Sequence, residues 1–191
     1  PVIATINPLP TVDVPPVTGQ QSCINGSFTF TATASAGSVM QWKVNSSNFA
    51  SPDFVGSPFI PTITGTTITV YYRAYNTTTL CASAVASITG LGIQLPASPI
   101  AVNSSRCAAG VLTISAIPGT GETIDWYSDP VATGSGSLLS TGSTSYTTGN
   151  LTATATYWAA TRNITSGCVS ITRTPVVATI VPIPGVPSIS L

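Results

Sequence analysis

Residues 123–128 read TIDWYS, and this stretch decides the fold. The apolar Ile124 and Trp126 alternate with more polar neighbours, so a strand here would bury both of them and point Asp125 toward solvent. A second alternating stretch, VLTISAIP at 111–118, precedes it across a glycine-containing turn. A tryptophan buried on a strand in this position is typical of the core of a β-sandwich.

The chain contains an internal repeat. Trp126 lies 19 residues after Cys107, and Trp42 lies 19 residues after Cys23 within a similar stretch, SVMQWKVN at 38–45. The other two cysteines are 87 residues apart. These spacings predict two tandem units, each close in size to the roughly 100 residues of a single β-sandwich.

A pair of aromatic residues recurs with nearly the same period. Tyr71-Tyr72 matches Tyr157-Trp158, 86 residues further on, and both pairs lie in alternating stretches that predict strands. The same alternation predicts a strand over 27–34 in the first unit. No segment has a helical period, so the fold class is all-β. The side chains that we expect in the two cores are Trp42, Trp126, Tyr72 and Trp158.

The two ends of the chain resemble each other. Residues 1–10 read PVIATINPLP and residues 175–184 read PVVATIVPIP, identical at seven of ten positions and 174 residues apart, which is twice the unit length. We therefore expect the first residues to be the last strand of a preceding repeat in a longer secreted protein. The predicted organisation is the last strand of a preceding repeat at 1–7, repeat one at 8–94, repeat two at 95–181, and a linker with the start of a following repeat at 182–191.

The low charge excludes several classes of function. The chain has five Lys and Arg against five Asp and Glu, 5% charged residues in all, and no His. It offers no electrostatic footprint for nucleic acid, and it lacks the commonest general base and metal ligand. The uncharged run between Arg73 and Arg106 is interrupted by prolines, so no membrane insertion is expected. We expect no catalytic residues and no cofactor.

Three carboxylates lie close together in the second unit: Glu122, Asp125 and Asp129. Their oxygens could serve a calcium ion, but the spacing has no D-x-D pattern, and calcium requires several converging oxygens. We interpret these residues as part of a solvated strand face and expect no metal site.

One surface of the first unit is a candidate contact face. Tyr71, Arg73 and Tyr75 alternate along a predicted strand, and Lys43 would flank them from the neighbouring strand. Aromatic and arginine side chains are enriched at binding hot spots. The simpler interpretation is ordinary cross-strand pairing on an exposed sheet face.

The cysteines are disulfide candidates: Cys23, Cys81, Cys107 and Cys168. Their even number, without a C-x-x-C pair, indicates disulfides and an oxidising compartment. In a sandwich, the two cysteines of one unit should lie at opposite ends of a strand, about 25 Å apart. Two pairings stay open. One joins Cys23–Cys81 and Cys107–Cys168 within units. The other joins Cys23 to Cys168 and leaves Cys81 and Cys107 for neighbouring repeats.

The sequence resembles a known family in four places: RCAAGVLTISA (106–116), IDWY (124–127), ATYWA (155–159) and SGCVS (166–170). These segments are similar to the Ig-like repeats of giant cell-surface adhesins of the Bacteroidetes, including the gliding-motility type. The first unit departs from that pattern at QQSCING (20–26). The resemblance implies two tandem Ig-like antiparallel β-sandwiches, type IX secretion and display at the cell surface, with no family catalytic residues to carry over.

These features together predict a structural repeat segment of a long cell-surface adhesin filament. It would extend and mechanically display the protein for surface attachment or gliding. The expected partners are neighbouring repeats of the same chain and a surface polysaccharide or another adhesion target. Two alternatives remain: a spacer or carbohydrate-contacting module of a secreted hydrolase, and a pilin-like subunit joined by donor strands.

Overall fold

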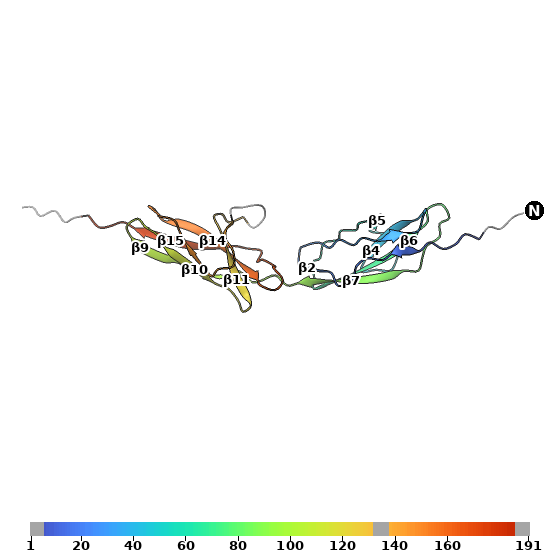
Figure 1. Ribbon diagram of the computed structural model, residues 1–191, viewed down its shortest axis with the longest axis horizontal. Coiled ribbons are helices and arrows are strands. Elements are labelled where there is room, and N and C mark those ends of the chain that lie inside the picture. The colour runs from blue at the N-terminus through green and yellow to red at the C-terminus, as the bar shows by residue number, and fades with distance from the viewer. Residues whose placement is uncertain (1–5, 132–137, 186–191) are drawn as a thin grey trace, which may run out of the picture. The chain divides into compact units, whose positions relative to one another are not determined.

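The computed structural model describes residues 6–131 and 138–185 of the chain, and every regular element in them is a β-strand. The chain divides into two compact units, Pro1–Gln94 (unit 1) and Leu95–Leu191 (unit 2). Each unit is an Ig-like β-sandwich, so the predicted all-β fold is confirmed (Figure 1). No helix in the described residues is long and apolar enough to cross a membrane.

Unit 1 is built on a five-stranded sheet with the order β2-β7-β6-β4-β5, faced by the small sheet β1-β3. All pairings are antiparallel except that of β2 with β7, which is parallel. In Figure 1 these two strands lie side by side, and Cys23 is paired with Ile93 at their ends. The strands of unit 1 are β1 (Val12–Val14), β2 (Gln21–Cys23), β3 (Thr33–Ala34), β4 (Val39–Val44), β5 (Phe54–Val55), β6 (Thr67–Tyr75) and β7 (Ala86–Ile93).

The strand predicted over 27–34 is largely absent in unit 1. Only its last two residues, β3, form a strand, and the rest is held by isolated bridges such as Phe30 to Phe59. The facing segment contains Pro58 and Pro61, whose missing backbone N–H groups interrupt the hydrogen-bonded ladder. Side-chain burial nevertheless follows the predicted alternation, because Phe28 and Phe30 are both buried.

Unit 2 has the same architecture with a more regular second sheet. Its five-stranded sheet has the order β12-β11-β14-β15-β9, and its second sheet is β13-β10-β8. The parallel pair is β9 with β15, and it places Cys107 opposite Val181. The strands of unit 2 are β8 (Ile100–Val102), β9 (Ser104–Cys107), β10 (Thr113–Ile117), β11 (Glu122–Tyr127), β12 (Leu138–Ser140), β13 (Ser145–Thr147), β14 (Ala155–Asn163) and β15 (Thr174–Val181).

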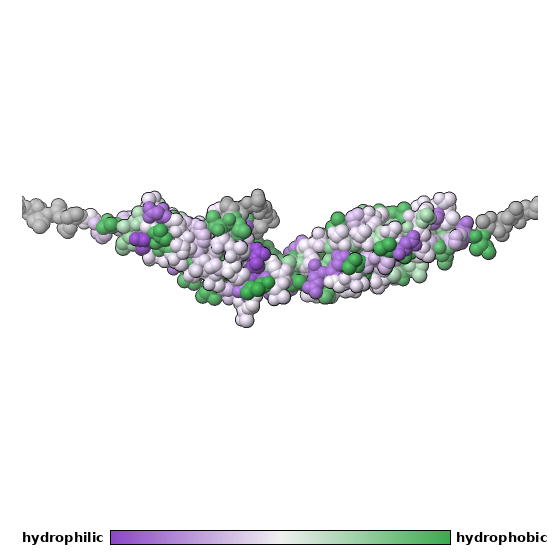
Figure 2. All heavy atoms as spheres, viewed as in Figure 1, coloured by the Kyte–Doolittle hydropathy of each residue, from purple (hydrophilic) through white to green (hydrophobic). Residues whose placement is uncertain are grey.

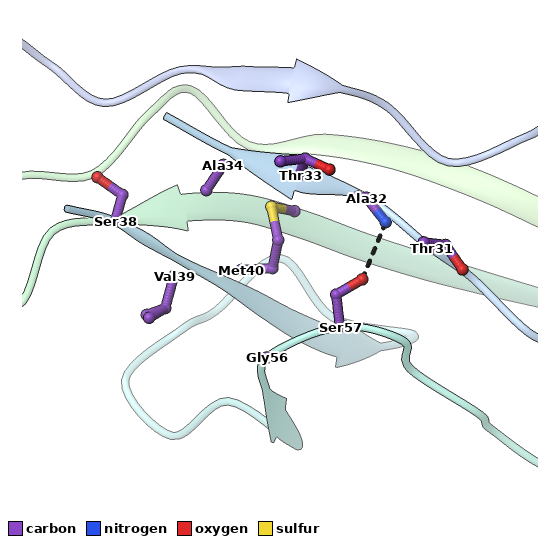
Figure 3. Close-up of a pocket in the computed structure, with 9 residues that line it drawn as sticks. All are labelled: Thr31, Ala32, Thr33, Ala34, Ser38, Val39, Met40, Gly56 and Ser57. Carbon is purple, nitrogen blue, oxygen red and sulfur yellow. Dashed lines mark hydrogen bonds between the residues drawn. The ribbon is translucent and has the colours of Figure 1, made fainter. Parts of the chain in front are cut away.

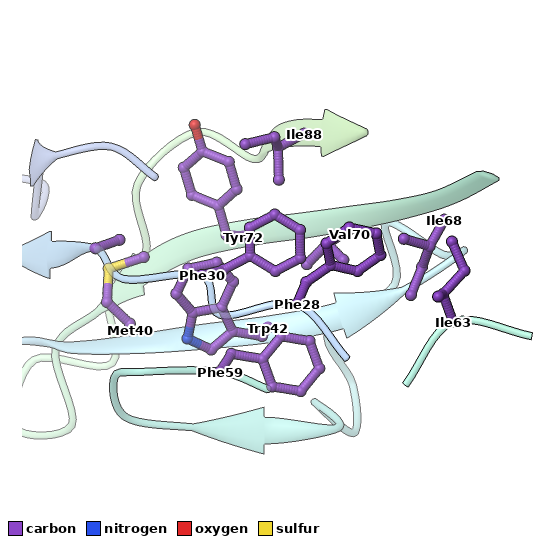
Figure 4. Close-up of a cluster of buried hydrophobic side chains, with 11 residues drawn as sticks. Phe28, Phe30, Met40, Trp42, Phe59, Ile63, Ile68, Val70, Tyr72 and Ile88 are labelled. Carbon is purple, nitrogen blue, oxygen red and sulfur yellow. The ribbon is translucent and has the colours of Figure 1, made fainter. Parts of the chain in front are cut away.

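The core of unit 1 is a stack of aromatic rings around Trp42. The indole is fully buried, and its ring centroid lies 5.7 Å from those of both Phe59 and Tyr72. Figure 4 shows these rings between the two sheets, with Phe30 beside them. The indole Nε1–H donates to the carbonyl oxygen of Gly56 at 2.6 Å, so the one polar atom of this side chain is satisfied.

The core of unit 2 is organised around Trp126. This side chain is fully buried, and its Nε1–H donates to the carbonyl oxygen of Ser143 at 2.8 Å. The ring of Tyr146 stacks on it at 5.9 Å between centroids. Smaller aliphatic side chains, among them Ile114 and Val176, fill the remaining space.

The core assignment of Trp158 is wrong. Its neighbour Tyr157 packs against the core, while Trp158 is half-buried and lies opposite Tyr127 on the outer face of the sheet. The Trp126 side chain instead faces Ala159 across the strands. Matching the aromatic pairs at 86 residues placed β14 one residue out of register. In a strand, a shift of one residue moves every side chain to the opposite face.

The predicted flanking segments fall mostly outside the described residues. Of the expected last strand of a preceding repeat at 1–7, the structure describes residues 6 and 7, and of the expected linker at 182–191 it describes 182–185. These two segments stay predictions.

Candidate functional site

The outer face of the large sheet in unit 1 brings together the residues of the predicted contact face. Arg73 lies opposite Gln41, Tyr71 opposite Lys43, and Tyr75 lies further along β6 on the same face. All four predicted residues are partly exposed, because they lie on the outer face of β4 and β6, whose intervening side chains point into the core.

Arg73 is the centre of this contact face. Its Nε–H donates to the Gln41 side-chain oxygen at 2.8 Å, and its guanidinium carbon lies 4.6 Å from the ring centre of Phe49 and 5.4 Å from that of Tyr75. Both distances are within cation–π range. Phe49 was not predictable from the sequence, because it lies on the loop after β4, where no alternating pattern marks it.

Lys43 has a local partner on the same surface. Its ammonium nitrogen lies 2.7 Å from Asp53 Oδ1, and it also donates to the carbonyl oxygen of Ser51 at 2.8 Å. The hydrogen bond from Lys43, together with one from the Val44 backbone N–H, lowers the pKa of Asp53 below its ordinary value. The contact face therefore presents aromatic rings and one arginine, with the lysine charge balanced beside them.

In unit 2, the prediction that Asp125 points into solvent is wrong. This carboxylate does not point into solvent, because it is fully buried. Arg162 on β14 donates to Oδ2 through Nε at 2.8 Å and through a second nitrogen, and the Thr141 hydroxyl donates to Oδ1 at 2.6 Å. The long Arg162 side chain and the segment around Thr141 cover the carboxylate. Strand alternation alone could not reveal that cover.

The surroundings of Asp125 determine its protonation. Burial acts to raise the pKa, but the hydrogen bonds from Arg162 and Thr141 and the positive charge of Arg162 outweigh it, and the pKa lies below the ordinary value of 3.8. The same pairing raises the pKa of Arg162. Asp125 is therefore an ionised structural partner at neutral pH, not a general acid.

Acidification is expected to destabilise unit 2 through Asp125. A carboxyl whose pKa is lower in the folded than in the unfolded state stabilises the fold at higher pH, and this stabilisation is lost as the pH falls from about 4 through the folded-state pKa. We expect Asp125→Asn to flatten this part of the profile. The measurement is denaturant unfolding of both proteins at several pH values between 6 and 2. Equal slopes in the two proteins would contradict the assignment.

The three acidic residues of unit 2 do not converge on a common point. The Glu122 carboxylate accepts from the Gly119 backbone N–H at 2.9 Å, and Asp129 pairs with Arg173 at 2.8 Å. Arg173 in turn lies over the ring of Tyr127, 3.4 Å from its centre. Within the described ranges, no group of three or more candidate ligands surrounds a metal position.

An open depression in unit 1 lies beside β3 and β4. Figure 3 shows its lining, in which the Ala32 backbone N–H donates to the Ser57 hydroxyl at 3.1 Å. Met40 forms part of the floor and is buried. The lining carries no charged side chain, so it offers hydroxyl and apolar contacts but no acid–base chemistry. The residues that line it are Thr31, Ala32, Thr33, Ala34, Ser38, Val39, Met40, Gly56 and Ser57.

The visible surface of each unit is mostly of intermediate hydropathy. Figure 2 shows largely pale residues there, with strongly hydrophilic and strongly hydrophobic areas that are small and separate. This pattern reflects a chain with only 5% charged residues. A neutral hydroxyl-rich surface responds weakly to salt, because few of its interactions are Coulombic.

The cysteines occupy two kinds of position. Cys23 and Cys168 are disulfide-bonded, whereas Cys81 and Cys107 are free thiols, the former partly buried and the latter exposed. Same-unit pairing, Cys23 with Cys81 and Cys107 with Cys168, is therefore not what the structure has.

Comparison with known families locates unit 2 among Ig-like domains. Residues 96–182 match the family model described as "Ig-like domain CHU_C associated". No curated protein is significantly similar to the chain. The match covers the unit in which the sequence resemblance is complete.

Solved structures with similar folds contain tandem modules. The fibronectin(III)-like modules of Clostridium thermocellum CbhA share 16% identity at a TM-score of 0.43, over 91% of this chain and 95% of that one. Three N-terminal domains of the bacteriophage RB49 Hoc capsid protein share 10% identity at a TM-score of 0.41, over 91% of this chain and 70% of that one. The FN1–FN3 domains of chicken CNTN1 share 15% identity at a TM-score of 0.40, over 88% of this chain and 66% of that one.

Proposed function

We propose that the chain is a structural repeat segment of a long cell-surface adhesin filament, exported by the type IX route. The observation that carries this proposal is the internal repeat, which is built as two Ig-like sandwiches. Charged side chains in both units form ion pairs within the fold. Asp125 with Arg162 and Lys43 with Asp53 are examples. Ig-like sandwiches typically serve as structural or binding modules, which supports a non-catalytic role.

An extracellular location is supported by two features. Disulfide-bonded cysteines are typical of oxidising compartments outside the cytosol. The family match to residues 96–182 supports the same assignment. In this proposal the neighbouring repeats are the immediate partners, and their number sets how far the filament reaches from the cell.

Attachment in this proposal is weak at each repeat and strong in sum. The target in this proposal is a sugar ring that stacks on the partly exposed rings of Tyr71 and Tyr75 beside Arg73. Many such faces along one filament raise avidity without a single deep site. Filaments that move along the surface would link this attachment to gliding.

Live-cell labelling tests the proposed function. A fluorescent antibody raised against the full chain is applied to living cells of the source organism, and cells lacking the parent gene serve as the control. We expect labelled filaments at the cell surface, and movement of the label along the cell supports gliding. Label found only in the medium would overturn the filament and favour a module of a secreted hydrolase.

A further inference from the structure

Cys23 and Cys107 occupy equivalent positions at the trailing end of their units, the end at which the chain leaves. Each cysteine ends the strand that runs parallel to the last strand of its unit, opposite Ile93 in unit 1 and Val181 in unit 2. The next residue in each case donates its backbone N–H to that partner's carbonyl oxygen at 3.0 Å. The two trailing-end cysteines are therefore the same structural position.

Cys81 and Cys168 are equivalent at the other end of their units. The carbonyl oxygen of Cys81 accepts from the backbone N–H of Asn76, and that of Cys168 accepts from Asn163, both at 2.9 Å. Each asparagine side chain also accepts from a backbone N–H two residues on, at 2.9 and 3.0 Å. These matching loops join the last two strands of each unit.

These loops lie at the leading end, where the chain enters the unit. In unit 1, Ser83 shares a small depression with Pro10 and Val12 at the start of the unit. In unit 2, the Thr174 hydroxyl donates to the carbonyl oxygen of Pro99 at 2.9 Å. Each unit thus carries one cysteine at its leading end and one at its trailing end.

The two cysteines of one unit are too far apart to pair. The last strand of unit 1, Ala86–Ile93, separates the two ends, and its seven steps span about 23 Å at about 3.3 Å per residue. Disulfide-bonded Cα atoms lie within about 7 Å of each other. The same separation applies in unit 2 along Thr174–Val181.

The bonding states differ between the equivalent positions. At the trailing end Cys23 is oxidised and Cys107 is free, and at the leading end Cys168 is oxidised and Cys81 is free. The oxidised pair are the two cysteines that flank the connection from β7 to β8, residues 94–99. The free pair are those that would flank connections to further repeats.

We propose that disulfides join successive repeats along the chain, the trailing-end cysteine of each repeat pairing with the leading-end cysteine of the next. Cys23 pairs with Cys168, Cys107 pairs with a following repeat, and Cys81 pairs with a preceding one. Each bond forms from two thiols with loss of two protons and two electrons, which reduce the disulfide of a thiol–disulfide oxidant. This inference rests on the proposed function, because it requires further repeats beside these two.

Such bonds would close every connection between repeats into a covalent loop. A pulling force would then be carried across the junction by both the main chain and the disulfide. A half-buried Cys81 and an exposed Cys107 are accessible enough for this reaction.

A tandem of the chain tests the inference. Residues 1–181 are followed directly by residues 8–191, which keeps the 174-residue period and creates one new junction. The protein is folded in a glutathione redox buffer, alkylated and mapped by proteolysis and mass spectrometry without reduction. We expect a peptide joining Cys107 of the first copy to Cys81 of the second, and about tenfold less alkylation there than at the outer Cys81 and Cys107.

Two variants act as matched controls. Cys107→Ser in the first copy should release the inner Cys81 for alkylation, whereas Cys107→Ser in the second copy should leave the new bond intact. Inner cysteines that react as fast as the outer ones would overturn the inference, as would peptides joining Cys23 to Cys81 of the same unit. Neither result would affect filament labelling on cells, so failure here is distinguishable from failure of the proposed function.

Discussion

Trp126→Ala is expected to destabilise unit 2 by about 4 kcal/mol, within the usual range for removing a buried tryptophan. The indole is fully buried, stacks against Tyr146 and donates to the carbonyl oxygen of Ser143. Its loss leaves a cavity between the two sheets and a carbonyl without its donor. Native-state hydrogen exchange followed by mass spectrometry measures the effect, because peptides from each unit report on their own stability.

Trp158→Ala in the same unit is the matched control. This side chain has the same volume and lies on β14, but it is half-buried on the outer face of the sheet. We expect less than half of the destabilisation caused by Trp126→Ala. Similar losses from the two substitutions would contradict the register that places Tyr157 and not Trp158 against the core.

Arg162→Met is the second substitution with a large expected effect. It leaves the fully buried Asp125 carboxylate without its cationic partner, and breaking a buried ion pair in this way costs about 3–5 kcal/mol. About a third of the Arg162 side chain is exposed, at 34%, so we expect a loss near the lower end of this range. Denaturant unfolding at neutral pH measures it.

The double variant Asp125→Leu with Arg162→Met separates the two contributions. Replacing both members of a buried pair by apolar side chains of similar size is often neutral, so we expect most of the lost stability to return. A double variant as unstable as Arg162→Met alone would show that the arginine acts through packing and not through the carboxylate.

The sequence alone was sufficient to place three of the four predicted core side chains, Trp42, Tyr72 and Trp126. Trp42 and Trp126 were predictable because alternation around each tryptophan leaves one face apolar, and because the 19-residue spacing from a cysteine occurs twice. Tyr72 follows from the same alternation and is buried. Periodicity is a local property, so it can be recognised before any long-range contact is known.

The candidate contact face was also accessible from the sequence, but its chemistry was not. Alternation placed Tyr71, Arg73 and Tyr75 on one face, and the structure shows them there with Lys43. The ring of Phe49 over Arg73 and the pairing of Lys43 with Asp53 depend on loops that fold back over the sheet. The path of a loop back over the sheet depends on long-range contacts, which no local sequence pattern shows.

By itself, the sequence determined the strand class, the repeat and the two buried tryptophans, because each depends on spacing along the chain. Only the tertiary structure decided the face of Trp158, the burial of Asp125 and the bonding state of each cysteine. The face of Trp158 depends on a one-residue register between strands, and the burial of Asp125 depends on Arg162, 37 residues away. The bonding state of each cysteine depends on the end of the sandwich at which it lies, and the directions of the strands in three dimensions determine that end.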